Sequence, residues 1–230
     1  MQDCNRCVLV LGGSFDPVHA GHIALAEKFS ALLQADELRI VPAGNPWQKQ
    51  GLEATAGQRV DMLELAFGEN VQVQSQVPAQ VPVVIDMQEV LRADHLQASY
   101  TVDTLQTLRK GLGEQCSIVF LIGADQLQNL HTWRRWQELF NYAHVCAASR
   151  PGFRLDQATV PHTVAQEFAR RRGTPEQIRK SASGLTYLAS DLDVDISATQ
   201  IRAELKQGGD AAALVPPKVL DYIQQHHLYR

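Results

Sequence analysis

The sequence of 230 residues lacks an apolar run near the roughly 18 residues that a membrane-spanning helix needs. Its first residues also lack the basic and apolar segments of a secretory signal, so we expect a cytoplasmic protein without membrane contact. A formal net charge of −4 argues against a general nucleic-acid binder, because nucleic acid attracts basic surfaces. These absences direct attention towards small-molecule partners.

The four cysteines lack the spacing of a metal or redox module. Cys4 and Cys7 make one CxxC pair, without a second pair or the histidine spacing of a zinc module. Cys7 begins an apolar run and is better explained as part of a buried strand. No GxGxxG follows this run and the chain has no GxxxxGK[ST] segment, which disfavours a dinucleotide-dependent dehydrogenase and a P-loop ATPase.

Apolar runs alternate with segments of helical periodicity. Strands are predicted at 7–11, 37–41, 71–77, 118–122, 142–148 and 185–189. Helices are predicted at 22–32, 58–67, 102–112, 161–172, 197–208 and 219–225, and around Leu130, Trp133 and Leu139. This rhythm predicts an α/β, Rossmann-like doubly wound fold, with a mostly parallel sheet of five or six strands and helices on both faces.

We expect residues 1–230 to form a single domain. Residues 150–184 interrupt the rhythm and are interpreted as an insertion-like excursion, whose charge run Arg170–Arg172 is typical of a solvated face. Residues 197–230 are predicted to form a small helical C-terminal part.

The segment Leu9–His22, LVLGGSFDPVHAGH, joins a strand to a helix through a glycine-bearing loop. Gly12 and Gly13 allow a sharp turn and a close approach of a ligand to the main chain. His19 and His22 add imidazole donors where the unpaired N–H groups of a helix start attract anions. The segment therefore predicts a phosphate site. Its HxxH spacing would also suit a metal pair, but no third ligand follows at a usual spacing.

A second candidate segment, ISATQIR, begins at Ile196. Ser197 is a typical helix N-cap, Thr199 adds a hydroxyl in the first turn, and Arg202 follows about one turn later. Hydroxyls, N–H groups and a guanidinium can together bind a polyphosphate. In isolation, the same pattern would indicate a capped helix with a surface arginine.

These two segments resemble the two motifs of the HxGH nucleotidylyltransferase superfamily. Ser99–Leu105 (SYTVDTL), Phe120–Leu139 and the C-terminal LVPPKVLDYI segment are further similar to the bacterial nicotinate-nucleotide adenylyltransferase family. The matches run in order from residue 9 to the C-terminus, with interruptions mainly at 50–98 and 150–184. The resemblance implies transfer of AMP from ATP to nicotinate mononucleotide in NAD biosynthesis, with Mg²⁺, giving deamido-NAD and pyrophosphate.

The resemblance also implies roles for single residues. The catalytic residues would be His19, His22 and Arg202, which stabilise charge on the phosphates. The ATP-binding residues would be Gly12, Gly13, Ser14, Phe15, Ser197 and Thr199. The mononucleotide-binding residues would be Lys49, Tyr100, Thr101, Gly123, Asp125 and Trp133. Lys49 lies in NPWQK, which departs from the PPHK-like loop of the family, and Trp133 would otherwise be a core residue.

Two alternatives remain open at this point. One is another HxGH adenylyltransferase, which would act on nicotinamide mononucleotide or phosphopantetheine. The other is a non-catalytic nucleotide sensor, against which His19, His22 and Arg202 argue. The sequence also leaves open whether the protein is a monomer or a homo-oligomer.

Overall fold

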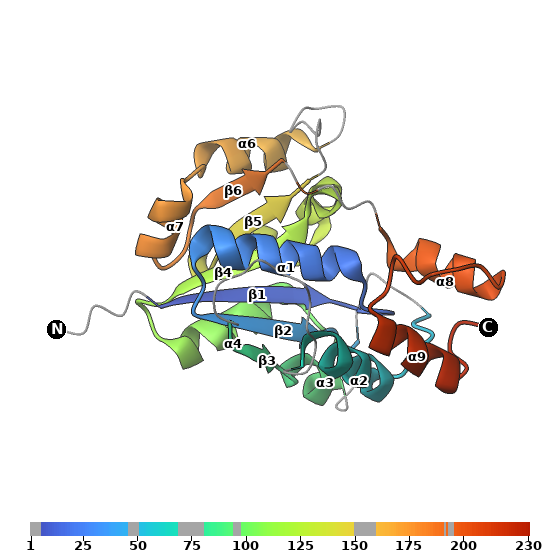
Figure 1. Cartoon of the computed structure of the whole chain (residues 1–230). Helices are drawn as coiled ribbons and strands as arrows, with labels where there is room; N and C mark the ends of the chain where they lie inside the picture. The colour runs from blue at the N-terminus through green and yellow to red at the C-terminus, as the bar shows by residue number, and fades with distance from the viewer. Residues whose placement is uncertain are drawn as a thin grey trace.

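The computed structural model describes residues 6–45, 51–68, 81–93, 98–149, 160–190, 192 and 196–230. Within these residues, six parallel strands form one sheet in the order β3-β2-β1-β4-β5-β6 (Figure 1). The strands are β1 (Cys7–Gly13), β2 (Glu37–Pro42), β3 (Val83–Ile85), β4 (Ser117–Gly123), β5 (His144–Ala148) and β6 (Thr186–Ala189). This is the strand order of the doubly wound dinucleotide-binding fold, which confirms the predicted fold class.

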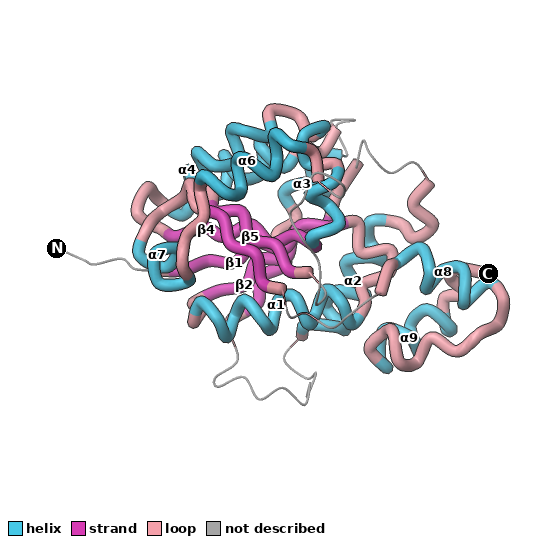
Figure 2. Tube along the Cα trace, turned by 90° about the horizontal axis from the view of Figure 1, so that it is seen from above, coloured by secondary structure: helices cyan, strands magenta, loops and turns pink. Residues whose placement is uncertain are grey.

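Helices cover both faces of the sheet (Figure 2). The longer helices are α1 (Ala20–Leu33), α2 (Ala56–Phe67), α4 (Thr101–Leu112), α6 (His162–Arg170), α8 (Ala198–Lys206) and α9 (Pro217–Gln225). The shorter ones are α3 (Gln88–Ala93), α5 (Leu139–Tyr142) and α7 (Pro175–Lys180). The 3₁₀ segments are η1 (Ala124–Gln128), η2 (Leu130–Thr132) and η3 (Trp136–Glu138).

Two hydrophobic cores lie on opposite faces of the sheet, because alternate residues of a strand point to opposite sides. In β1, Leu9 and Leu11 face a core shared with α1, α2 and α9, whereas Val8 and Val10 face a core shared with α4 and α6. Every residue of β1 before its two glycines is buried, as expected for a parallel strand that is covered on both faces.

Several local predictions differ from the structure. The helix predicted around Leu130, Trp133 and Leu139 is wrong, because this region forms η1 to η3 and only a short α5. Arg135 has a positive φ of 50°, and this left-handed conformation interrupts any continuous helix. The fifth strand begins at His144 and not at Tyr142, which ends α5.

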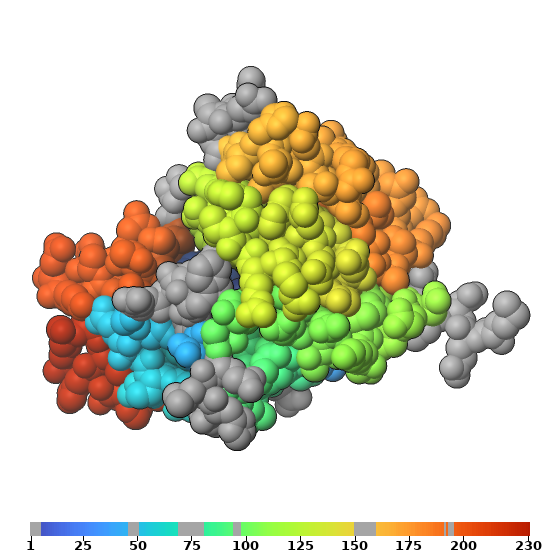
Figure 3. Space-filling view, turned by 180° about the vertical axis from the view of Figure 1, so that it is seen from behind, coloured from blue at the N-terminus to red at the C-terminus, as the bar shows by residue number. Residues whose placement is uncertain are grey.

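The sequence did not predict β3, α3 or α7, each of which has six residues or fewer and too short a pattern for a periodicity signal. The strand predicted at 71–77 lies outside the described residues. Residues 160–184 connect β5 to β6 and carry α6 and α7, whose Phe168 and Ile178 are buried in the two cores. Figure 3 shows the same arrangement from behind, with α6 above the yellow-green segment that precedes β5.

The carboxyl ends of the strands point towards α8 and α9, which lie together at one end of the molecule (Figure 1). α9 packs against α2, and Ala20 N of α1 donates to the Leu214 carbonyl in the segment before α9. The C-terminal helices thus lie beside the edge where parallel sheets bind ligands. No helix in the described part of the chain is long and apolar enough to cross a membrane.

Candidate active site

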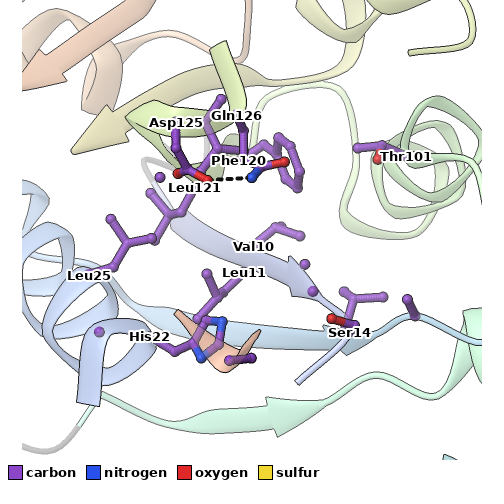
Figure 4. A pocket seen from close by; sticks show the side chains of 18 of the residues that line it. Val10, Leu11, Ser14, His22, Leu25, Thr101, Phe120, Leu121, Asp125 and Gln126 are labelled. Atoms are coloured by element: carbon purple, nitrogen blue, oxygen red, sulfur yellow. Dashed lines mark hydrogen bonds between the residues drawn. The ribbon is translucent and has the colours of Figure 1, made fainter. Parts of the chain in front are cut away.

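A cavity of about 980 Å³ opens at the carboxyl edge of the sheet. The sheet contributes the carboxyl-terminal parts of its strands and the residues that follow them, 10–14, 41, 43, 120–126, 148 and 149. The start of α1 contributes 19, 21, 22 and 25, and other segments contribute 89, 99–101, 104, 128, 133, 134, 192, 196–198 and 200. Figure 4 shows His22 on one side of this space and Asp125 on the other, with Leu11 of β1 between them. The cavity is large enough for a nucleotide and a second small molecule.

The first motif joins β1 to α1, as predicted from its helical spacing, but Gly12 and Gly13 are the last paired residues of β1 and the turn follows them. A Cβ at Gly13 would lie 3.1 Å from the ring of Phe15, so glycine allows the close packing of this turn. Phe15 has a positive φ of 50° and is buried, with its ring edge-on to His22 at a centroid distance of 4.9 Å. Gly12, Gly13 and Ser14 line the cavity, whereas Phe15 packs behind it.

His19 and His22 lie together at the N-terminus of α1, with ring centroids 3.7 Å apart. The backbone N–H of His19 donates to Nδ1 of His22 at 3.2 Å. Because Nδ1 accepts this bond, the neutral His22 ring carries its proton on Nε2 and can donate from there. Both imidazoles line the cavity at the positive end of a 14-residue helix, which is a favourable position for an anion.

The second motif begins α8 as predicted, with Ser197 as its N-cap. The Ser197 hydroxyl accepts from Gln200 N at 3.2 Å, and Gln200 Oε1 accepts from Ser197 N at 3.2 Å. Ser197 and Gln200 line the cavity. Thr199 is exposed and does not contribute to the lining.

Arg202 also lies outside the lining of the cavity. Its Nη1 donates to the carbonyl of Asp16 at 2.7 Å, and its Nε lies 3.2 Å from Glu53 Oε1. The two motifs, separated by almost the whole chain, therefore meet, but through the loop between Gly13 and His19. Arg202 contacts the back of that loop and not the cavity.

The predicted mononucleotide residues Tyr100, Thr101, Gly123, Asp125 and Trp133 all line the same cavity. A Cβ at Gly123 would lie 2.4 Å from Asp125 Oδ1, so the glycine lets the carboxylate fold back over the end of β4. Asp125 Oδ2 accepts from Gln126 Nε2 at 2.6 Å (Figure 4). Lys49 lies outside the described residues.

Aromatic rings form one wall on this side. Trp133 packs edge-on against Phe120 at a centroid distance of 6.2 Å. Its Nε1 is buried and has no hydrogen-bond partner among the described residues. The Arg134 guanidinium lies 4.6 Å above the ring of Tyr100, a geometry that stabilises both groups. This wall offers π faces to a planar heterocycle.

Sequence reasoning missed a buried polar cluster below this wall. Thr104 Oγ1 donates to Glu89 Oε1 at 2.6 Å and accepts from Arg92 Nη2 at 2.6 Å. Burial raises the pKa of Glu89, and the bond from Thr104 and the charge of Arg92 partly offset this effect. Glu89 comes from the unpredicted α3, so no periodic signal marked it.

Comparisons with known proteins agree with this geometry. A family model described as cytidylyltransferase-like matches residues 10–204. A "Probable nicotinate-nucleotide adenylyltransferase" of Herminiimonas arsenicoxydans is 56% identical over 230 residues, which is 100% of both chains. A protein of the same name from Dechloromonas aromatica is 40% identical over 225 residues, 96% of each chain.

Among solved structures, the nicotinic acid mononucleotide adenylyltransferase of Plasmodium falciparum complexed with NaAD has a TM-score of 0.71, with 97% of each chain covered. Its sequence identity of 19% makes this a similarity of fold.

Proposed function

The chain belongs to the nicotinate-nucleotide adenylyltransferase family, and from this premise we propose that its cavity holds ATP beside nicotinate mononucleotide. The enzyme transfers AMP from ATP to the mononucleotide and forms deamido-NAD and pyrophosphate in NAD biosynthesis. The observation that carries the proposal is a single cavity with imidazoles at a helix start on one side and an aromatic wall on the other. The working unit would be residues 1–230 as one domain, acting in the cytoplasm.

The reaction joins two anions, so the protein has mainly electrostatic and positional work to do. A phosphate oxygen of the mononucleotide must attack the α-phosphorus of ATP in line while pyrophosphate leaves. We assign the ATP phosphates to the backbone of residues 12–14, the start of α1 and the start of α8, because all three line the cavity and helix starts attract anions. His22, with its donor Nε2, and His19 would stabilise charge on the α-phosphoryl group.

Tyr100, Thr101 and Trp133 are assigned to the pyridine end of the mononucleotide. Trp133 offers a ring face, and the start of α4 at Thr101 offers backbone N–H groups to the pyridine carboxylate. Asp125 is placed to accept from a ribose hydroxyl, as acidic residues at strand ends do in dinucleotide folds. Arg202 is assigned a supporting role, since it bonds the loop that joins the phosphate residues to the histidines.

A divalent metal requirement is typical of nucleotidyltransferases, and we propose Mg²⁺. The described residues contain no group of three His, Cys, Asp or Glu side chains that could hold a metal. Carboxylates in the lining stand singly, at Glu89 and Asp125, which suits an ion held largely by phosphate oxygens. Bound there, Mg²⁺ would neutralise phosphate charge during the transfer.

The test is pyrophosphate release from ATP and Mg²⁺ with nicotinate mononucleotide, nicotinamide mononucleotide or phosphopantetheine. We expect the highest kcat/KM with the nicotinate substrate. An equal or higher value with either alternative would refute the substrate assignment. ATP binding without turnover of any of the three would favour the nucleotide sensor.

The same assay tests the histidine assignment. His22→Ala should lower kcat at least about a hundredfold, the size typical of losing one donor that stabilises developing charge. His162→Ala is the matched control, because His162 is exposed at the start of α6 and does not line the cavity. An unchanged kcat in His22→Ala would remove His22 from the catalytic residues.

A further inference from the structure

The loop between the glycines and the histidines is bonded from behind by four other parts of the chain. We call residues 14–17 the first-motif loop. Its partners are Arg59 of α2, the Glu53–Ala54 backbone before α2, Arg202 of α8 and Tyr229 at the C-terminus. None of these partners lines the cavity. The bonds therefore act on the loop and not on a ligand.

Asp16 is the centre of this network. Its side chain is buried, with Oδ2 accepting from Glu53 N at 2.9 Å and Oδ1 accepting from Ala54 N at 3.1 Å. Oδ1 also accepts from the hydroxyl of Tyr229 at 2.7 Å. A buried carboxylate is tolerated when donors surround it, so Asp16 serves to hold the loop in one position.

Arg59 holds the loop from the side of α2. It is 1% exposed, and its Nη1 donates to the Ser14 carbonyl at 2.7 Å. Burial lowers the pKa of Arg59, and the nearby charge of Asp16 opposes this effect. Ser14 itself lines the cavity, so this bond connects the buried network to the phosphate-binding backbone.

Tyr229 is the most distant member in sequence and is 4% exposed. It has a positive φ of 58°, a conformation that costs a non-glycine residue energy and is retained where surrounding contacts maintain it. Burial and the bond to Asp16 raise the pKa of Tyr229, so its hydroxyl keeps its proton and remains a donor. The end of the chain is therefore held against the first motif.

We propose that Tyr229 is a positioning residue for ATP, which acts through Asp16 to fix the first-motif loop and so the relative placement of Ser14, His19 and His22. The inference rests on the proposed function and extends it to a residue outside the cavity. Its effect should fall on ATP, since the loop joins residues assigned to the phosphates and none assigned to the mononucleotide.

The chain offers a matched control for this role. Tyr222 of α9 donates its hydroxyl to Asp61 Oδ2 of α2 at 2.6 Å. This is also a tyrosine-to-aspartate bond between the C-terminal part and the first half of the chain, but it does not contact the first-motif loop. Tyr229→Phe and Tyr222→Phe each remove one hydroxyl and keep the ring.

Tyr229→Phe should lower kcat/KM for ATP at least about tenfold, the size expected when a hydrogen bond to a charged group is lost. KM for the mononucleotide should stay within about twofold of wild type, and Tyr222→Phe should leave both parameters within about twofold. Melting temperatures of both variants show how much each bond stabilises the fold. A purely structural Tyr229 would lower the melting temperature but leave ATP kinetics equal to those of Tyr222→Phe, which would overturn the proposal.

ATP affinity from calorimetry separates this proposal from the proposed function. A wild-type protein that binds ATP but releases no pyrophosphate refutes the enzyme assignment, while Tyr229 is still tested by affinity. Weaker ATP binding in Tyr229→Phe than in Tyr222→Phe would support the positioning role. Equal affinities combined with equal ATP kinetics would refute it.

Discussion

His144 is fully buried at the start of β5 and uses both ring nitrogens in hydrogen bonds. Its Nε2 lies 2.9 Å from the Ser181 carbonyl, and its Nδ1 accepts from Leu185 N at 3.1 Å. This arrangement needs a proton on Nε2 and none on Nδ1, so the ring is neutral. Burial lowers the pKa of His144 to about 4; the bond to the Ser181 carbonyl opposes this shift, and the charge of Arg109 adds to it.

Because the pKa of His144 is lowered in the folded state, the free energy of unfolding should depend on pH. Between the ordinary histidine pKa of 6.5 and about 4, the unfolded chain takes up a proton that the folded protein does not. Stability should therefore be lost as the pH falls through this window, by about 3 kcal/mol in total from this group and by about 2 kcal/mol between pH 7 and pH 5. In urea unfolding at pH 7 and pH 5, His144→Gln should lose less stability on acidification than wild type. The control His131→Gln changes an exposed side chain and should lose as much stability on acidification as wild type. If His144→Gln lost as much as this control, the prediction would be contradicted.

At the scale of elements, α3 packs directly on the backbone that follows β2. A Cβ at Gly44 would lie 2.0 Å from the carbonyl oxygen of Glu89 and 2.7 Å from the Cβ of Ala93. The next residue, Asn45, makes two hydrogen bonds with Ser99. Asn45 N donates to Ser99 Oγ at 3.2 Å, and Ser99 N donates to the Asn45 carbonyl at 3.0 Å. Three segments that line the aromatic side of the cavity are thus held together by close packing at Gly44 and by the two hydrogen bonds between Asn45 and Ser99.

Gly44→Ala should move α3 away, because the blocking atom is a backbone oxygen. We expect a loss of about 1 to 3 kcal/mol in unfolding free energy and a higher KM for the mononucleotide, since Glu89 and Ser99 line its side of the cavity. Gly57→Ala is the control, because a Cβ in this turn of α2 meets nothing within 4 Å. It should stabilise the protein by about 0.4 to 1 kcal/mol. Equal changes in unfolding free energy and KM for the two substitutions would contradict the close contact between Gly44 and α3.

At the scale of the whole molecule, the carboxyl ends and the amino ends of the strands have different roles. The cavity lies at the carboxyl ends, whereas the buried Arg109 of α4 connects the segments that enter the strands at their amino ends. Its guanidinium donates to the carbonyls of Gly113, Cys116, Tyr142 and Ala182, at 2.7 to 3.1 Å. These carbonyls precede β4, β5 and β6, so one side chain connects the entries of three strands.

Arg109→Met should lower the unfolding free energy by about 3 kcal/mol or more, because it leaves several buried carbonyls without donors. Burial lowers the pKa of Arg109, but an arginine remains charged at neutral pH. Arg170→Met removes an exposed arginine that pairs with Glu167 and should cost less than about 1 kcal/mol. Denaturant titration of both variants measures the difference, and comparable losses would show that Arg109 contributes little. At low temperature, kcat should stay near the wild-type value in both.

The sequence predicted the parts of the site that depend on neighbouring residues. The helix after the first motif and the cap at Ser197 follow from local patterns and are present, although α1 begins at Ala20 and not at the predicted His22. Gly12 and Gly13 are the last paired residues of β1, so the chain turns after them and not at them. Arg59 was not predicted, although its spacing from Met62 and Leu63, three and four residues later, places it on the buried face of α2. An arginine on an apolar helix face usually has a buried partner, here Ser14.

The sequence by itself determined the layers and the connection from strand to helix at the first motif, because hydrophobic periodicity acts over a few residues. The tertiary structure alone decided that Tyr229 meets Asp16, that Arg202 contacts the back of the loop, and that Glu89 reaches the cavity. These contacts join residues that are distant in the chain, and a side chain carries no local pattern that identifies such a partner. They form where the crossovers and the C-terminal helices converge on the carboxyl edge of the sheet.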